Sequence, residues 1–182
     1  MRLAIPRRLG RLAPVVLAGC ALTGVPAVAT AASPCSSASA STMTAATMVS
    51  DTQCLLNQKR AEHGLRALKL DSRLTRAALG HSREMVTKRY FEHDSHSGRP
   101  FGSRIASTGW MDGRRRWAIA ENIAWGQGSR ATPRAIMRSW MHSATHRNNI
   151  LNGGFRVVGI GVTRGTPVAG LSGGTYTTDF GS

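Results

Sequence analysis

Three side chains that could do chemistry lie far apart in the sequence: His93 in YFEHDS, Glu121 in AENIAWG and His146 in SATHRNNIL. Two imidazoles and one carboxylate are a suitable ligand set for zinc or another divalent cation, with one coordination position left open. Without a metal, Glu121 could instead orient one imidazole while the other titrates near neutral pH. The third interpretation is structural, because buried polar groups must find hydrogen-bond partners in any case.

The local signatures of common enzyme sites are missing from the chain. It contains no His-Glu-x-x-His helix, no Gly-x-Ser-x-Gly turn and no glycine-rich phosphate loop. Any site must therefore be assembled from distant segments.

Residues 1–31 have the pattern of an export signal peptide. An apolar run from Leu12 is followed by the small residues Ala29-Thr30-Ala31, which suit signal peptidase. The positive charges come first, at Arg2, Arg7, Arg8 and Arg11. Secretion is the main prediction, and a lipid anchor at Cys20, within the lipobox-like Leu17-Ala18-Gly19-Cys20, is the alternative. No later segment approaches the roughly 20 apolar residues of a membrane span, so we expect none in the mature chain.

The cysteines predict a disulfide bond. If Cys20 leaves with the signal peptide, Cys35 and Cys54 remain as an even pair in an oxidising compartment. We expect these two to be bonded, and two free thiols are the alternative. Once the bond is assigned, no cysteine nucleophile remains.

Composition divides the rest of the chain and indicates its partners. Residues 32–47 are an Ala/Ser/Thr-rich linker that carries Cys35, and residues 48–182 are expected to form one domain. Removing the four arginines of the signal peptide leaves 20 basic residues against nine acidic ones, a net charge of +11. This surplus favours anionic partners such as cell-wall polymers, phospholipid head groups or nucleic acid. With aromatics at 5% there is little platform for stacking bases, so specific nucleic-acid binding is not expected.

The helix signals are strongest in the first half of the domain. A helix is predicted from an N-cap at Asp51 to a stop at Gly64. A second is predicted after Asp71, and its apolar face brings His81 to the edge of the core. That face is formed by Leu74, Ala77, Ala78, His81 and Met85.

The second half alternates loop, strand and helix. A short helix is predicted around residues 104–107, and a short strand or turn in WAIAENIAWG. Thr132 and Pro133 predict a helix start, with Ile136, Trp140 and Ser143 on one side. FRVVGIGVTRG and GGTYTTDFG predict an antiparallel hairpin, which makes the domain α+β. Further predictions concern burial: core positions for Trp125, Trp140 and Phe155, exposed positions for His63, His96 and His142, and backbone capping by Asn122 and Asn149.

Six motifs occur in an order that resembles one known family. They are LLNQKRAEHGLRALKLDSRLTRAALGHSREM, YFEHDSHSGRPFGSRI, AENIAWG, SWMHSATHRNNIL, VVGIGV and YTTDFG. Together they resemble the CAP superfamily of cysteine-rich secretory, antigen-five and pathogenesis-related proteins, in its small bacterial secreted form. The similarity runs from about Met48 to Gly181.

The resemblance implies a three-layer α-β-α sandwich with a central, largely antiparallel sheet. It also implies a surface cavity lined by two histidines and two acidic residues. The matching positions are His93, Glu121, His146 and, in place of the second acid, Ser143. Losing that carboxylate weakens both the metal and the acid/base interpretation.

Three functions compete on these grounds. The first is a secreted, non-catalytic binding module whose cavity takes a divalent cation, a lipid or sterol-like molecule, or a wall fragment. The second is a metal-assisted hydrolase, a protease or nuclease with Glu121 as base and the two histidines as ligands. The third is an interaction protein for anionic cell-wall polymers. We expect a binding module rather than an enzyme, and the sequence specifies no oligomeric state.

Overall fold

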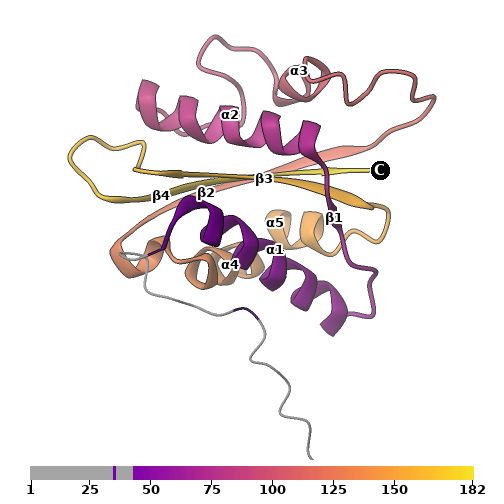
Figure 1. The fold of residues 1–182 in the computed structure, drawn as a ribbon, viewed down its shortest axis with the longest axis horizontal. Helices are drawn as coiled ribbons and strands as arrows, with labels where there is room; N and C mark the ends of the chain where they lie inside the picture. The colour runs from indigo at the N-terminus through magenta and orange to yellow at the C-terminus, as the bar shows by residue number, and fades with distance from the viewer. Residues whose placement is uncertain (1–34, 36–42) are drawn as a thin grey trace, which may run out of the picture. The chain divides into compact units, whose positions relative to one another are not determined.

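The computed structural model describes Cys35 and residues 43–182 (Figure 1). The predicted signal peptide, Cys20 and most of the 32–47 segment lie outside the described residues. The helices are α1 (Ala45–Glu62), α2 (Ser72–Lys88), α3 (Phe101–Ala106), the 3-10 helix η1 (Gly128–Ala131), α4 (Pro133–His142) and α5 (Ala144–Ile150). The strands are β1 (Lys69–Leu70), β2 (Ile119–Gln127), β3 (Val157–Arg164) and β4 (Gly173–Gly181).

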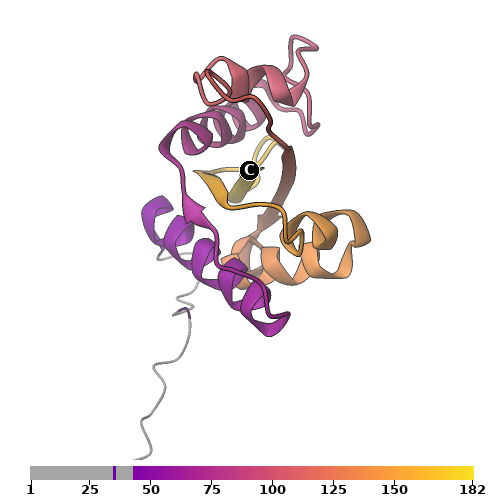
Figure 2. The same cartoon turned by 90° about the vertical axis from the view of Figure 1, so that its right-hand side faces the viewer.

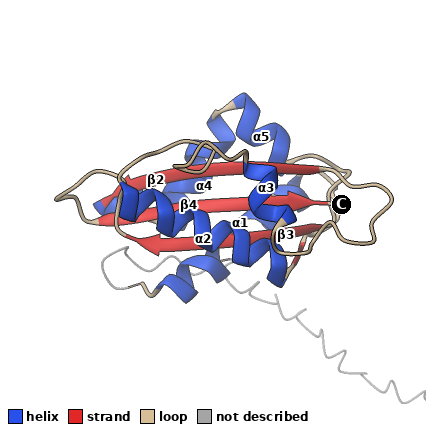
Figure 3. Cartoon of the chain, turned by 90° about the horizontal axis from the view of Figure 1, so that it is seen from above, coloured by secondary structure: helices blue, strands red, loops and turns tan. Residues whose placement is uncertain are grey.

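The elements form the predicted three layers. Helices α1, α4 and α5 cover one face of the sheet, and α2 and α3 lie over the other face (Figures 1 and 2). The strand order is β1-β3-β4-β2, and β3 and β4 form the predicted antiparallel hairpin. Strand β2 pairs antiparallel with β4, so β2 is an edge strand (Figure 3). The short β1 pairs in parallel with Val157 and Val158 alone, and β3 from Gly159 onward has no strand on that side among the described residues.

Most predicted helix signals are confirmed. Asp71 caps α2 by accepting hydrogen bonds from the backbone N–H groups of Arg73 and Leu74. Thr132 caps α4, and Pro133 is its first residue. Ser143 does not continue the buried side of α4, because the helix ends at His142 and Ser143 separates α4 from α5.

The predicted start of the first helix is wrong. Helix α1 begins at Ala45, capped by Thr44, and Asp51 is a buried residue inside it. Alanine has the highest helix propensity, and Met48 packs into the core, so tertiary contacts extend the helix toward its N-terminus. The composition that indicates a linker is thus compatible with the first turns of a helix.

Two clusters of apolar side chains hold the layers together. The larger lies between the sheet and α1, α4 and α5, and it includes Trp140 and Phe155 as predicted. The smaller joins α2 to α3 through Leu74, Ala77, Ile105 and Trp110. The prediction for Trp125 is wrong: it is half-buried and belongs to neither cluster, because β2 is an edge strand.

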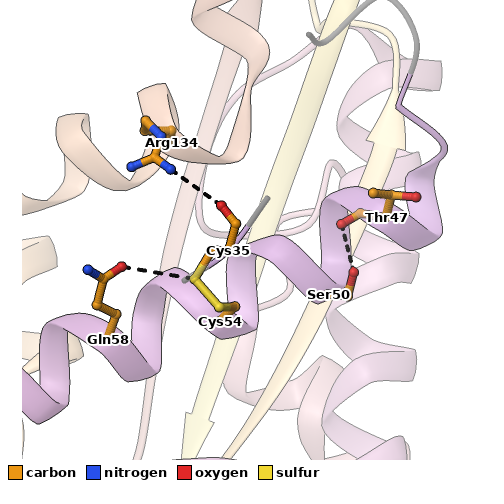
Figure 4. The surroundings of a disulfide bond; sticks show 6 residues. All are labelled: Cys35, Thr47, Ser50, Cys54, Gln58 and Arg134. Atoms are coloured by element: carbon orange, nitrogen blue, oxygen red, sulfur yellow. Dashed lines mark hydrogen bonds between the residues drawn. A yellow bond between two sulfur atoms is a disulfide. The ribbon is translucent and has the colours of Figure 1, made fainter. Parts of the chain in front are cut away.

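A disulfide bond joins Cys35 to Cys54 of α1, as predicted (Figure 4). It closes a loop with a sequence separation of 19 residues. In the chain-entropy view a loop of this length stabilises the fold by roughly 3 kcal/mol. Arg134 of α4 donates a hydrogen bond to the Cys35 carbonyl, at 3.3 Å (Figure 4), so Cys35 contacts α4 as well as α1.

Helix α2 packs directly on the backbone of β3 because β3 carries glycine at two positions. A Cβ atom at Gly159 would overlap the backbone of Leu74, and one at Gly161 would overlap Ala78 and Leu79. Any larger residue there must push α2 away from the sheet.

We expect Gly161→Ala to lower the free energy of unfolding by about 1–3 kcal/mol, the usual cost of overpacking. Gly80→Ala is the matched control, since Gly80 is an exposed position in α2 with open space around it. That change should stabilise the protein by up to about 1 kcal/mol through helix propensity. Urea unfolding of both variants is the measurement, and equal effects would contradict the packing argument.

Candidate functional site

The predicted residue Glu121 is buried at the centre of an ion-pair cluster with the exposed His93 and the half-buried Arg104. Its side chain is 1% exposed, and it points from β2 toward the layer that contains α2 and α3. Its Oε1 accepts a hydrogen bond from Nδ1 of His93, at 2.8 Å, and its Oε2 accepts one from Arg104, at 2.5 Å. His93 lies in the loop after α2, and Arg104 lies in α3. One carboxylate therefore holds two separate segments against the edge of the sheet.

His146 reaches the same edge from the opposite layer. It lies in α5, and a hydrogen bond of 2.8 Å joins its Nδ1 to the Ser143 hydroxyl. Asn122, the neighbour of Glu121 on β2, faces α5 and donates to the His146 carbonyl. Burial lowers the pKa of His146, and the positive charge of His93 lowers it further. The structure thus brings all four predicted residues to the edge of β2, with one histidine from each layer.

Two further members of the cluster were not predicted from the sequence, Arg104 and Asp179. Asp179 of β4 lies opposite Glu121 in the strand register and is 1% exposed. Burial raises the pKa of Asp179 well above its ordinary value, and the negative charge of Glu121 adds to this effect. Burial would also raise the pKa of Glu121, but His93 and Arg104 outweigh it and the pKa is lowered. The pair therefore favours one negative charge on Glu121 and a neutral Asp179.

The residue pattern offered one clue to Asp179, its alternation with the polar residues Thr175 and Thr177 in TYTTDFG. It offered no clue that Glu121 is its partner, because the pairing of β2 with β4 joins segments that are distant in the sequence.

The predicted zinc ligands His93, Glu121 and His146 are hydrogen-bonded to other side chains in this structure. Among the described residues no group of three His, Cys, Asp or Glu side chains is placed to hold a metal ion. Both oxygens of Glu121 are engaged, and the Arg104 guanidinium places a positive charge against the carboxylate. Ser143 occupies the position of the second acidic residue in the family pattern, and its hydroxyl supplies no negative charge.

The other polar predictions concern residues around this cluster. His81 is fully buried in α2, and its Nε2–H donates to the Glu92 carbonyl at the start of the His93 loop. Asn149 donates to the Glu121 carbonyl and Asn122 to the His146 carbonyl, so both asparagines bind backbone groups as predicted. The three histidines predicted to face solvent are exposed: His63, His96 and His142.

A separate apolar groove lies at the other edge of the sheet. It has a volume of about 510 Å³ and runs between α1 and α2 along the part of β3 that has no neighbouring strand. Apolar side chains and Thr75 and Thr163 form most of its lining, and the charged residues are Arg83 and Arg164. The apolar lining consists of Ala45, Ala46, Val49, Leu79, Ile160 and Val162.

Comparison with known proteins identifies similar chains in several bacteria. Residues 54–177 match the profile of the cysteine-rich secretory protein family (CAP). The chain is 37% identical over 108 residues to the Bacillus subtilis protein YkwD and 32% identical over 110 residues to the Bacillus subtilis membrane protein YlbC. These matches cover 59% and 60% of this chain, but only 39% and 30% of the two relatives.

Solved structures show the same fold. An extracellular protein containing an SCP domain from Bacillus anthracis superimposes with a TM-score of 0.61 at 30% identity, over 76% of this chain and 43% of that one. An outer surface protein of Borrelia burgdorferi gives a TM-score of 0.63 at 15% identity, over 81% and 98% of the two chains. A cysteine-rich secretory protein of Staphylococcus aureus gives 0.56 at 19% identity, over 76% and 39%.

The ion-pair cluster predicts a large energetic coupling between Arg104 and Glu121. Arg104→Met leaves a buried carboxylate without its main counter-charge and should cost about 3 kcal/mol of stability or more. Glu121→Gln in the same chain removes the charge that needs compensation, so the double variant should lose clearly less than the two single losses together. Urea unfolding of the four proteins in the cycle measures the coupling. If the stability losses of the two single variants add up to that of the double variant, Arg104 does not stabilise the buried charge of Glu121.

Proposed function

The chain belongs to the cysteine-rich secretory protein (CAP) family, and on this premise we propose that it acts outside the cell as a non-catalytic binding protein. We place its ligand in the apolar groove between α1, α2 and β3. The observation that carries this proposal is the combination of a largely apolar groove with two arginines in its lining.

The groove suits a molecule with an acyl chain and an anionic head group. Its volume of about 510 Å³ lies in the usual range for small-molecule sites, and burying apolar chain there contributes about 0.8 kcal/mol per CH₂ group. Arg83 is exposed and forms no ion pair among the described residues, so it can bind a carboxylate or phosphate. Arg164 donates to the Met43 carbonyl, which holds its side chain beside the groove.

The metal-assisted hydrolase has less support. A general base needs a carboxylate that can reach the substrate, but Glu121 is buried with both oxygens bonded. A third ligand for zinc would have to come from outside the three predicted residues or from a rearranged Glu121. Zinc binding therefore remains a prediction, and no step of the proposed function depends on it.

Export has two supports. The Cys35–Cys54 bond is typical of proteins that fold in an oxidising compartment. The Bacillus anthracis protein with the same fold is described as extracellular. Among the described residues, no helix is long and apolar enough to cross a membrane.

Titration calorimetry with dodecanoate and dodecanol tests the groove. We expect dodecanoate to bind with one site, and Arg83→Gln to weaken it about tenfold, the scale of one charge-assisted hydrogen bond. Arg76→Gln is the matched control, because Arg76 is exposed on the same helix outside the groove and carries the same charge. Dodecanol carries no charge, so it should bind more weakly than dodecanoate, and Arg83→Gln should leave its affinity unchanged.

Val49→Trp fills the groove and should block both ligands while the protein remains folded. Undiminished dodecanoate binding by this variant would overturn the assignment. So would the absence of saturable binding by the unmodified protein. Loss of dodecanoate binding in a folded His146→Ala variant would move the site to the β2 edge.

A further inference from the structure

A row of basic side chains extends along η1 and α4, which we call the basic ridge. It consists of Arg130, Arg134, Arg138 and His142, and all four are exposed. Arg134, Arg138 and His142 recur at every fourth position, so they lie on one side of α4, about 6 Å apart along its axis, and Arg130 precedes them in η1.

The ridge residues form no ion pair among the described residues, and the carboxylate on which their charge acts is the buried Asp51, beside Arg134. Residues 122–178 contain six arginines and no aspartate, glutamate or lysine. The carboxylates that form ion pairs in the described part of the chain, those of Glu62, Glu84 and Glu121, contact Lys59, His81, His93 and Arg104 instead. Arg134 donates a hydrogen bond to the Cys35 carbonyl (Figure 4). The side chains of Arg130 and Arg138 form no hydrogen bond within the described part of the chain.

A groove flanks the ridge on each side. One has a volume of about 490 Å³ and contains the half-buried Trp125 together with Ile136 and Ser139. The other, of about 260 Å³, lies against α1 and contains Gln58 and Met137. Arg138 and His142 line both grooves, and Trp125 lines the larger one together with them.

We propose that the basic ridge and the Trp125 groove bind an anionic polysaccharide. Guanidinium groups bind carboxylates and phosphates in bidentate geometry, and a regular row of them matches a polymer with regularly spaced charges. The indole offers a flat apolar face to a sugar ring, with polar groups nearby for its hydroxyls. A single indole provides no series of stacking platforms for bases, and a recessed indole does not insert into a bilayer. This site is separate from the apolar groove at β3 and does not depend on the acyl-chain proposal.

The test compares polygalacturonate with its methyl ester, a polymer of the same sugar without the charge. Binding to the mature protein is followed by tryptophan fluorescence and by affinity electrophoresis. We expect polygalacturonate to bind, the methyl ester to bind far more weakly, and binding to weaken as salt rises from about 0.05 M to about 0.3 M.

Two pairs of variants separate the ridge from net charge. Arg130→Gln with Arg138→Gln should lower the affinity about tenfold or more, since two charge-assisted contacts are lost. Arg66→Gln with Arg76→Gln removes the same charge from exposed positions elsewhere, and about a twofold loss is expected from screening alone. Arg134 is left unchanged because it supports the Cys35 segment. Unaltered thermal unfolding confirms that each variant is folded.

Trp125→Leu tests the groove itself, because it changes no charge. It should weaken polygalacturonate binding about fivefold, within the range for loss of an aromatic contact, and should remove the fluorescence response. Val49→Trp, which fills the β3 groove, should leave polygalacturonate binding unchanged.

Three results would overturn the proposal. If the two double variants lose equal affinity for polygalacturonate, net charge alone explains the binding. An unchanged affinity in Trp125→Leu would remove the groove from the site. Tighter, ridge-dependent binding of single-stranded DNA or of phosphatidylglycerol vesicles would assign the ridge to a different partner.

Discussion

The buried carboxylate of Glu121 is the constraint on which this end of the domain depends. A charge held at 1% exposure must be paired, because removing a carboxylate from water costs several kcal/mol. Its partners come from a loop and from α3, so the pairing fastens both to the edge of β2. Burial and the negative charge of Glu121 raise the pKa of Asp179 beside it, which favours a single negative charge on the two carboxyl groups. The same bonds that hold these segments in place occupy the oxygens that a metal or a substrate would need.

The two edges of the sheet therefore have different properties. The β2 edge is polar: Glu121 bonds to His93 and Arg104 on one face, and Asn122 bonds to Asn149 of α5 on the other. The β3 edge is left without a neighbouring strand, because β1 pairs with two residues of it and then ends. The glycines of β3 bring α2 down onto the sheet beside this edge, and α1 lies on the opposite face. The apolar groove is the space that remains between the two helices.

Local signals in the sequence were sufficient for much of the fold. The caps at Asp71 and Thr132 are short-range hydrogen bonds, and the β3–β4 hairpin joins segments close in the chain, so both could be predicted. The motif order indicated the α-β-α layers and brought His93, Glu121, Ser143 and His146 together. Features that depend on distant segments were missed: the Arg104 ion pair, the register that places Asp179 against Glu121, and the edge position that leaves Trp125 half-buried. The start of α1 was missed because its first turns are stabilised by tertiary packing.

We propose that ligand binds at the β3 edge, whereas the His93–Glu121–Arg104 cluster holds α3 and the loop after α2 in place. The most direct test of this proposal is a backbone amide chemical-shift map of the ¹⁵N-labelled protein during titration with dodecanoate. Saturable chemical-shift changes should centre on the amides of Val49, Leu79 and Ile160. Shifts that centre instead on His93, Glu121 and His146, with none along β3, would contradict the proposal.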